Sequence, residues 1–233
     1  MAEHIDLKTN LRAPLSRERV LRAAVDLADR EGLDSLTMRR LGQELGVEAM
    51  SLYNYVANKD DLLDGMVDIA FGEIDLSSDG RDWKAVMHKR AVSARETLVR
   101  HPWAVGLMEA RVKAGPANLR HHDSVIGILR KAGFSMDMAA HAYSLMDSYI
   151  YGFALQQMNM PAAALKQAPD EAREFLRQFN AEDYPHLSEM VVEHAMEKGY
   201  DYGDEFEFGL SLILDGLARF KKKTGAELSR TGR

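Results

Sequence analysis

Polar and basic side chains that can bind a phosphate or the edge of a base gather between Leu36 and Lys59. The segment reads LTMRRLGQELGVEAMSLYNYVANK, and its apolar residues can form one cluster made of Leu41, Leu45, Val47, Leu52 and Val56. Packing of that cluster turns other side chains outward, namely Ala49, Met50, Ser51, Tyr53 and Asn54. Such an outward face suits the two kinds of contact, to phosphates and to base edges, that sequence-specific DNA binding combines.

Two short helices must position these side chains. Thr37 can cap a first helix over residues 38–45 through its hydroxyl group. Gly46 then supplies the left-handed backbone conformation that a sharp exit from a helix requires, and a second helix is expected from about residue 48 to 55. Two helices at a steep angle, joined by a turn with glycine, describe a helix-turn-helix, whose second helix enters the major groove of DNA.

The same stretch resembles a known family. LTMRRLGQELGVEAMSLYNYVANKDDLLDGM, with the preceding SRERVLRAAVDLADREGLDSLT, is similar to the N-terminal DNA-binding domain of the tetracycline-repressor (TetR) family. The most diagnostic features are the glycine turn, the Leu52-Tyr53 pair, Val56 and the Asn58-Lys59 helix start. The part from HPWAVGLMEAR to GFALQQMNMP more loosely resembles the ligand-binding domain of the tetracycline-repressor branch. The resemblance implies a homodimeric repressor whose partners are a double-stranded DNA operator and a small-molecule inducer.

Family positions that usually hold phosphates are matched here by Thr37, Tyr53 and Lys59. Lys59 is doubly suited, because the start of its helix also attracts anions. Arg39 matches a position that reaches a base in the family, and a guanidinium group can bind guanine through two hydrogen bonds. Arg40 is expected to contact a phosphate or to be a surface charge.

The base-reading positions of the second helix differ from those of the tetracycline repressor. Ala49 and Met50 stand where that repressor has polar or rigid readers, so here they offer only apolar contact, for example with a thymine methyl group. Ser51, Asn54 and Tyr55 remain for polar readout, and the operator is expected to differ. The alternative is that these side chains form only the solvated side of a helical hairpin.

Composition is ordinary for a folded protein, with 46% hydrophobic and 28% charged residues. The net charge of −6 argues weakly against a nucleic-acid partner, but basic residues are frequent in the first 60 positions, and only the face near the phosphates must be positive. The chain has no cysteine, which excludes disulfides and is consistent with the cytoplasm. No signal peptide is expected, and His141 and Asp147 interrupt the longest apolar stretch, so no membrane partner is expected either.

The expected fold is all-helical. An N-terminal three-helix domain with a helix-turn-helix should be followed by a larger helical domain for ligand binding and dimerisation. A flexible arm over residues 1–15 precedes the DNA-binding domain at 16–75, which includes a connecting helix over about 59–74. The second domain should cover 76–224, with a helix near 170–179, and a frayed tail should cover 225–233.

Dimerisation and ligand binding are both assigned to the second domain. By resemblance, residues 136–160 and 204–223 would form a four-helix bundle between two subunits. The proposed interface stripe on the last helix consists of Phe206, Leu210, Ile213, Leu217 and Phe220, and the alternative is a core stripe within one chain. Candidates for an apolar ligand pocket with methionine walls are Met66, Met87, Trp103, Leu107, Met108, His122, Val125, Leu129, Met146, Tyr149, Ile150 and Phe153, and the alternative is plain core.

No cofactor, metal site or catalytic residue is expected. The tetracycline repressor uses a histidine on the short helix after the Trp103 position to hold a magnesium-bound drug, but the matching position here falls at or near Leu107. His121 and His122 are adjacent and cannot face one point on a helix. No nucleophile–base pair or glycine-rich phosphate loop argues for an enzyme. A ligand-independent regulator whose second domain only dimerises is the remaining alternative.

Overall fold

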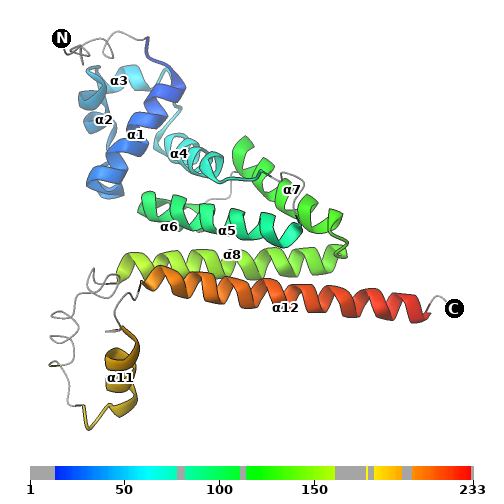
Figure 1. The fold of residues 1–233 in the computed structure, drawn as a ribbon. Helices are drawn as coiled ribbons and strands as arrows, with labels where there is room; N and C mark the ends of the chain where they lie inside the picture. The colour runs from blue at the N-terminus through cyan, green and yellow to red at the C-terminus, as the bar shows by residue number, and fades with distance from the viewer. Residues whose placement is uncertain are drawn as a thin grey trace, which may run out of the picture. The chain divides into compact units, whose positions relative to one another are not determined.

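The computed structural model describes residues 14–77, 82–110, 114–160, 177, 181–195 and 201–231, with side chains omitted at 109, 110 and 222–231. Every regular element in these ranges is helical, which confirms the expected all-helical fold (Figure 1). The expected arm at 1–15 falls mostly outside the described residues, as does the helix expected near 170–179. No helix in the described ranges has both the length and the apolar character that a membrane span requires.

The chain forms two compact units, and the division differs from the expected boundary after residue 75. Unit 1 comprises Met1–Ile74 and Arg100–Asp123, and unit 2 comprises Asp75–Val99 and Ser124–Arg233. Residues 100–123 join unit 1 because polar contacts tie them to its helices. The Trp103 indole donates to Asp29 at 2.6 Å, and the backbone N–H of Ala117 donates to Asp68 at 2.8 Å. These contacts join residues far apart in the sequence, so local pattern does not predict them.

Unit 1 contains the expected helix-turn-helix and its connecting helix. Its helices are α1 (Arg17–Glu31), α2 (Met38–Leu45), α3 (Ala49–Leu52), α4 (Lys59–Glu73) and α6 (Pro102–Ala110). Side-chain oxygens of Ser16, Thr37 and Asn58 accept backbone N–H groups at the starts of α1, α2 and α4. Each cap of this kind stabilises a helix by about 1 kcal/mol. The capping residues therefore define where these helices start.

The core of unit 1 joins the three N-terminal helices α1, α2 and α3, together called the head, to α4. It contains Leu27, Leu36, Leu41, Leu52 and Met66, whose side chains are fully buried. Leu41, Leu52 and Val56 of the predicted cluster are buried, whereas Leu45 and Val47 are half-buried. The apolar pattern of residues 36–56 is thus confirmed as the inner side of the head.

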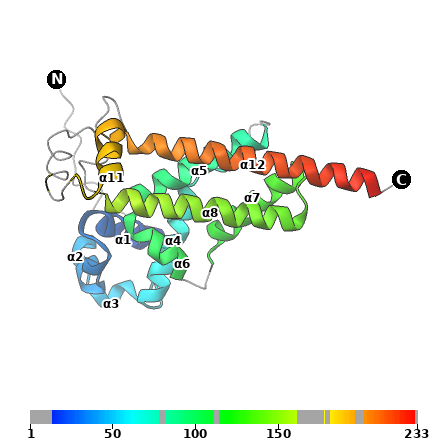
Figure 2. The ribbon, with the colours of Figure 1, turned by 90° about the horizontal axis from the view of Figure 1, so that it is seen from below.

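Unit 2 is built on long helices, which include most of α5 (Trp83–Arg100), the second half of α7 (Pro116–Lys131), α8 (Met136–Asn159), α11 (Pro185–Met190) and α12 (Tyr202–Thr231). In Figures 1 and 2, α8 and α12 lie side by side and run in opposite directions. The Tyr149 hydroxyl donates to the Glu205 and Phe206 carbonyls, and the Tyr149 and Phe206 rings stack at 5.3 Å. α12 continues to Thr231, beyond residue 225 where a frayed tail was expected.

Candidate nucleic-acid interface and ligand site

The turn between α2 and α3 depends on two glycines. Gly46 follows α2 with φ of 69°, a left-handed conformation that residues with a Cβ atom adopt at a cost. Gly42 is buried within α2, and a Cβ atom placed there would lie 2.8 Å from the Val47 carbonyl oxygen and 3.2 Å from the Ala49 nitrogen. The close approach of α2 to the start of α3 therefore requires the absence of a side chain at residue 42.

The expected recognition residues lie on α3 and on the turn that follows it. Met50 is 75% exposed and Tyr53 43% exposed, and Asn54 is exposed as well. Ala49, Ser51 and Tyr55 are half-buried. The helix itself is shorter than the expected 48–55, because it ends at Leu52 and residues 53–55 form turns. The outward side chains are nevertheless brought together on one short segment beside α2.

The expected phosphate contacts have different local environments. Thr37 is exposed, and its hydroxyl oxygen accepts the Arg40 backbone N–H at 3.1 Å. Lys59 is the exposed first residue of α4, where Asp60 also lies in the first turn. Arg40 forms an ion pair with Glu31 at 2.8 Å, and this hydrogen bond raises the pKa of the Arg40 side chain. Arg39 and Lys59 are exposed and form no ion pair with any side chain that the structure describes.

The exit from the recognition segment (residues 49–57) is held by the ion pair between Arg17 and Asp61. Arg17, the first residue of α1, donates from both terminal nitrogens to the two Asp61 oxygens, each at 2.7 Å, and also to the Tyr55 carbonyl at 2.8 Å. Asp61 in turn accepts the backbone N–H of Ala57 at 2.9 Å. Hydrogen bonding to Asp61 raises the pKa of Arg17. Arg17 and Asp61 are 44 residues apart, so no local pattern identifies them as partners.

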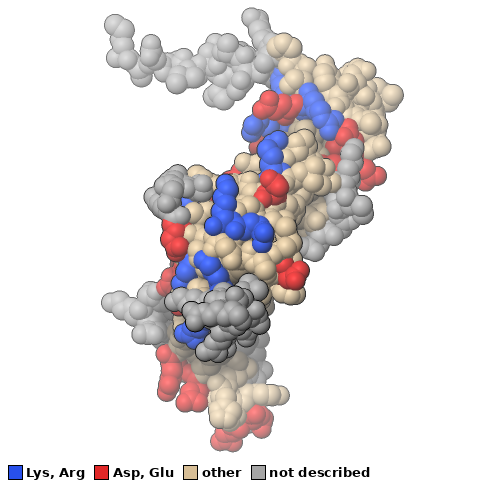
Figure 3. Space-filling view, turned by 90° about the vertical axis from the view of Figure 1, so that its right-hand side faces the viewer, with Lys and Arg blue, Asp and Glu red and all other residues tan. Residues whose placement is uncertain are grey.

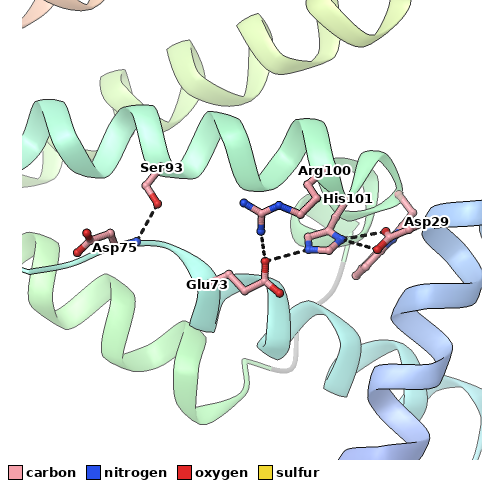
Figure 4. A network of polar contacts seen from close by, with 7 residues as sticks. Asp29, Glu73, Asp75, Ser93, Arg100 and His101 are labelled. Carbon is pink, nitrogen blue, oxygen red and sulfur yellow. Dashed lines mark hydrogen bonds and ion pairs between the residues drawn. The ribbon is translucent and has the colours of Figure 1, made fainter. Parts of the chain in front are cut away.

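A second polar network within unit 1 joins α1, α4 and the start of α6 (Figure 4). The buried His101 ring lies between two carboxylates, with Nδ1 2.9 Å from Asp29 and Nε2 3.1 Å from Glu73. Arg100 also pairs with Glu73, and Trp103 donates to Asp29. Trp103, expected to line a ligand pocket, is therefore bound to the helix that begins the DNA-binding head.

Most basic side chains of the head are paired with acidic ones. Arg22 binds Glu18 and Arg30 binds Glu44, in addition to the Arg17 and Arg40 pairs. On the face drawn in Figure 3, lysine and arginine side chains are interspersed with acidic ones. Positive charge in the described part of the head is thus mostly neutralised locally, which is consistent with the overall net charge of −6.

The expected ligand-pocket residues do not all belong to one unit. Met66, Trp103, Leu107, Met108 and His122 lie in unit 1, and the other seven lie in unit 2. In unit 2 the buried members are Met87, Val125, Leu129, Met146, Ile150 and Phe153, and Tyr149 is half-buried. Burial of this kind is shared by a ligand-lining residue and a plain core residue, so these residues remain candidates.

A buried charged cluster lies in the interior of unit 2. Arg90 of α5 binds Asp147 of α8 at 2.5 Å, and their side chains are 1% and 11% exposed. The pKa of the Tyr143 hydroxyl is raised well above its ordinary value. Burial is the larger cause, and the neighbouring Asp147 carboxylate is the next. Arg90 was not predicted as the partner of Asp147, because the two residues are 57 positions apart in the sequence.

An open groove of about 940 Å³ also belongs to unit 2 and runs between α5 and α12. Most of its lining residues have polar side chains, and these include Lys84, His88, Lys89, Glu96 and Glu207. Lys84 pairs with Asp215, and His88 lies 2.5 Å from Glu207. None of the expected ligand residues lines this groove.

The expected interface stripe on α12 is largely internal. Phe206, Leu210 and Leu217 are buried within the single chain, Ile213 is half-buried, and Phe220 is 58% exposed. Among the described side chains of α12, the large apolar Phe208 and Leu212 are also exposed, at 66% and 59%. The core interpretation therefore accounts for most of the predicted stripe. Phe208 and Leu212, which are four residues apart, lie on a second apolar face of α12 that the predicted stripe does not include.

The histidines do not assemble a metal site in the described parts of the chain, where no group of three or more potential ligands meets. His121 and His122 instead pack against Phe71 of α4, with ring centroids 5.3 and 5.6 Å from it.

Comparison with known proteins matches both parts of the chain to one family. Residues 20–66 match the model of bacterial regulatory proteins of the tetR family, and residues 76–220 match the tetracyclin repressor-like C-terminal domain. The HTH-type transcriptional repressor DrrR1 of Streptomyces coeruleorubidus is 34% identical over 215 residues, which cover 87% of this chain and 77% of DrrR1.

Solved structures agree with this result. The crystal structure of apo ActR from Streptomyces coelicolor is 29% identical and has a TM-score of 0.73, covering 91% of this chain and 99% of ActR. ActR in complex with actinorhodin is 28% identical, with a TM-score of 0.72 and coverage of 90% and 99%. The chain therefore belongs to the TetR family of helix-turn-helix DNA-binding transcriptional repressors.

Proposed function

We propose that the protein is a homodimeric repressor that binds a palindromic operator and is released from it by a small, largely apolar ligand. The observation that carries the proposal is the exposure of Met50, Tyr53 and Asn54 on a segment that begins directly after a glycine turn. A single head offers a small contact area, so specific affinity requires two heads on two half-sites.

Exposed apolar side chains on α8 and α12 support dimerisation. Leu145 and Leu155 of α8 are 48% and 49% exposed, and Phe208 and Leu212 of α12 are more exposed still. Because α8 and α12 pack side by side, four such residues on adjacent helices offer a surface that a second copy can cover. The dimer interface proposed here therefore uses Phe208, Leu212 and Phe220 rather than the buried Phe206, Leu210 and Leu217.

Relatives guide the choice of ligand. ActR has been crystallised with actinorhodin, and the tetracycline repressor protein class C of Escherichia coli is 29% identical over 213 residues. Methionine and aromatic side chains dominate the candidate residues of unit 2, which favours an apolar aromatic ligand. Actinorhodin and magnesium–tetracycline are the first probes. The position of the metal-binding histidine of the tetracycline repressor falls at or near Leu107 here, which argues against the second probe.

The test is selection of bound fragments from the sheared genome of the source organism by the full-length protein. We expect enrichment of a short palindrome that the dimer protects from nuclease, with Tyr53→Ala and Lys59→Ala abolishing retention in a gel-shift assay while sedimentation still shows a dimer. Recovery of no common sequence would contradict operator binding. A monomer bound to a single half-site would contradict the dimer.

A ligand-independent regulator is the second candidate, because the burial of Met87, Val125, Leu129, Met146 and Ile150 is as compatible with a filled core as with a ligand site. If unit 2 serves only as a dimerisation core, neither probe changes its thermal unfolding midpoint or releases the selected fragment. A rise in the midpoint together with release of DNA by either probe would instead support the inducible repressor.

A further inference from the structure

The recognition segment contains little helix of its own. α3 comprises only Ala49–Leu52, and the chain then passes through turns before Asn58 caps α4. A single helical turn has few internal hydrogen bonds, so contacts from outside must fix its orientation. Leu52 and Val56 are buried and hold two points of the segment. Tyr53 and Asn54 lie exposed between these two anchors.

Arg17 and Asp61 supply the polar restraint at the end of this segment. The Arg17 guanidinium group binds the Asp61 carboxylate through two bonds of 2.7 Å and the Tyr55 carbonyl through one of 2.8 Å. Asp61 accepts the backbone N–H of Ala57 at 2.9 Å, and its own N–H donates to the Asn58 side chain at 2.8 Å. Two backbone groups, the Tyr55 carbonyl directly and the Ala57 N–H through the Asp61 carboxylate, are therefore connected to the first residue of α1.

We propose that Arg17 and Asp61 are positioning residues for DNA binding, which hold the segment from Tyr53 to Asn58 in the arrangement that meets the duplex. The inference rests on the proposed recognition of an operator by this segment. In it, Arg17 acts through Asp61 and the backbone, and it is not a phosphate ligand. The planar, two-pronged geometry of the guanidinium group suits this role, whereas a lysine ammonium group would act only as a point charge.

A positioning role and a phosphate-binding role predict opposite effects of one substitution. Asp61→Asn removes a negative charge from the head and releases Arg17, so simple electrostatics predicts tighter binding to DNA. If Asp61 positions the segment, the same substitution weakens binding to the specific site. The direction of the change therefore distinguishes the two roles.

The experiment measures fluorescence anisotropy with the full-length protein and two 30-base-pair probes, at several salt concentrations. One probe is a duplex that the wild-type protein selects from a random library, and the other is its scrambled counterpart. We expect Asp61→Asn and Arg17→Gln each to weaken binding to the selected duplex about tenfold and to leave binding to the scrambled duplex within about twofold. The double variant should lose less affinity than the product of the two single losses, because the two variants share the Arg17–Asp61 interaction.

Two further variants control for charge and for folding. Glu44→Gln breaks the Arg30–Glu44 pair, which joins α1 to α2 at 2.8 Å, and removes one negative charge from the same head. We expect it to bind the selected duplex as tightly as the wild type, or more tightly. Arg17→Lys keeps the charge but loses the paired bonds, and should weaken binding nearly as much as Arg17→Gln. All measurements are made well below the lowest unfolding midpoint, determined by circular dichroism.

The proposal is overturned if Asp61→Asn binds the selected duplex as tightly as the wild type or more tightly. It is equally overturned if Arg17→Gln reduces the salt dependence on both probes by about one phosphate contact, since that is the behaviour of a phosphate ligand. Failure of the wild-type protein to select any sequence would instead reject operator recognition itself.

Discussion

The recognition segment and the interior of unit 2 differ in how well the sequence identifies their functional residues. Residues that touch DNA must lie outside the core, so the apolar pattern around Leu52 and Val56 identifies Met50, Tyr53 and Asn54 by exclusion. Residues that line an internal ligand site face inward, as core residues do. Met87, Met146 and Ile150 are fully buried and fit both descriptions. Solvent exposure therefore identifies candidate DNA-binding residues, but it does not separate ligand-binding residues from core residues in unit 2.

The ion pairs of the head and the one in the interior of unit 2 also differ in how far they are exposed to solvent. The ion pairs of the head are at least partly exposed, and Arg22–Glu18, with side chains 63% and 72% exposed, is the extreme case. In unit 2, Arg90 and Asp147 are paired in the interior. An exposed pair contributes about 0–1 kcal/mol, whereas removal of one partner from a buried pair costs about 3–5 kcal/mol. This contrast leads to the largest expected effect.

Asp147→Ala should lower the free energy of unfolding of unit 2 by about 3–5 kcal/mol, because it leaves the Arg90 charge buried without its carboxylate. Urea unfolding followed by Trp83 fluorescence in a Trp103→Phe background reports on unit 2. Glu18→Gln is the matched control and should change the stability by less than about 0.5 kcal/mol. Arg90→Met combined with Asp147→Leu should recover most of the loss. Equal effects of Asp147→Ala and Glu18→Gln would contradict the contrast.

Phe208→Ala should weaken the dimer without weakening the fold. Covering a phenylalanine contributes about 1.5–3 kcal/mol, so the dimer dissociation constant should rise at least about tenfold in sedimentation equilibrium. Phe206→Ala, two residues earlier but fully buried, should instead lower the stability of the chain by about 3–5 kcal/mol. Loss of chain stability with an unchanged dimer for Phe208→Ala would reverse the assignment of the two faces of α12.

Gly42→Ala should disrupt the turn of the head, since the new Cβ atom would lie 2.8 Å from the Val47 carbonyl oxygen. Backbone must move to relieve that contact, at a cost of about 1–3 kcal/mol, and binding to the selected duplex should fall with it. Gly127→Ala is the control, because no atom of its surroundings lies within 4 Å of an added Cβ. A helical alanine there should raise the stability by about 0.5–1 kcal/mol. Normal DNA binding by Gly42→Ala would show that the turn tolerates a shift.

Local signals predicted much of unit 1. Thr37 caps α2 as its side chain indicated, and α4 begins at the expected Asn58-Lys59 position. α2 spans the expected residues because its cap and its glycine both lie next to it. α3 proved shorter, since the turn residues after Leu52 have the same apolar spacing as a helix would. Caps and turns are interactions between near neighbours, which is why a sequence discloses them.

Contacts between distant residues could not be predicted in the same way. Arg17 and Asp61 are 44 residues apart, and Arg90 and Asp147 are 57 apart, so nothing in the neighbourhood of either residue identifies its partner. Most of the stripe predicted on α12 as a dimer interface is buried within the chain, for another reason. That helix carries apolar residues on two faces, and only the packing of Tyr149 against Phe206 decides which face is internal.

Met50→Ala should have the smallest effect on stability and the clearest effect on specificity. Because Met50 is 75% exposed, its truncation should change the free energy of unfolding by less than about 0.5 kcal/mol. Its apolar contact with a thymine methyl group would be lost, so a library selection with the variant should relax the preference at one position of each half-site. The measured change at that position should be about 1 kcal/mol, at the low end for a single base pair. An identical base preference in the wild type and Met50→Ala would mean that an exposed residue of the head need not contribute to sequence readout. Exposure alone would then not identify the DNA-contacting residues, just as burial does not identify the ligand-binding residues of unit 2.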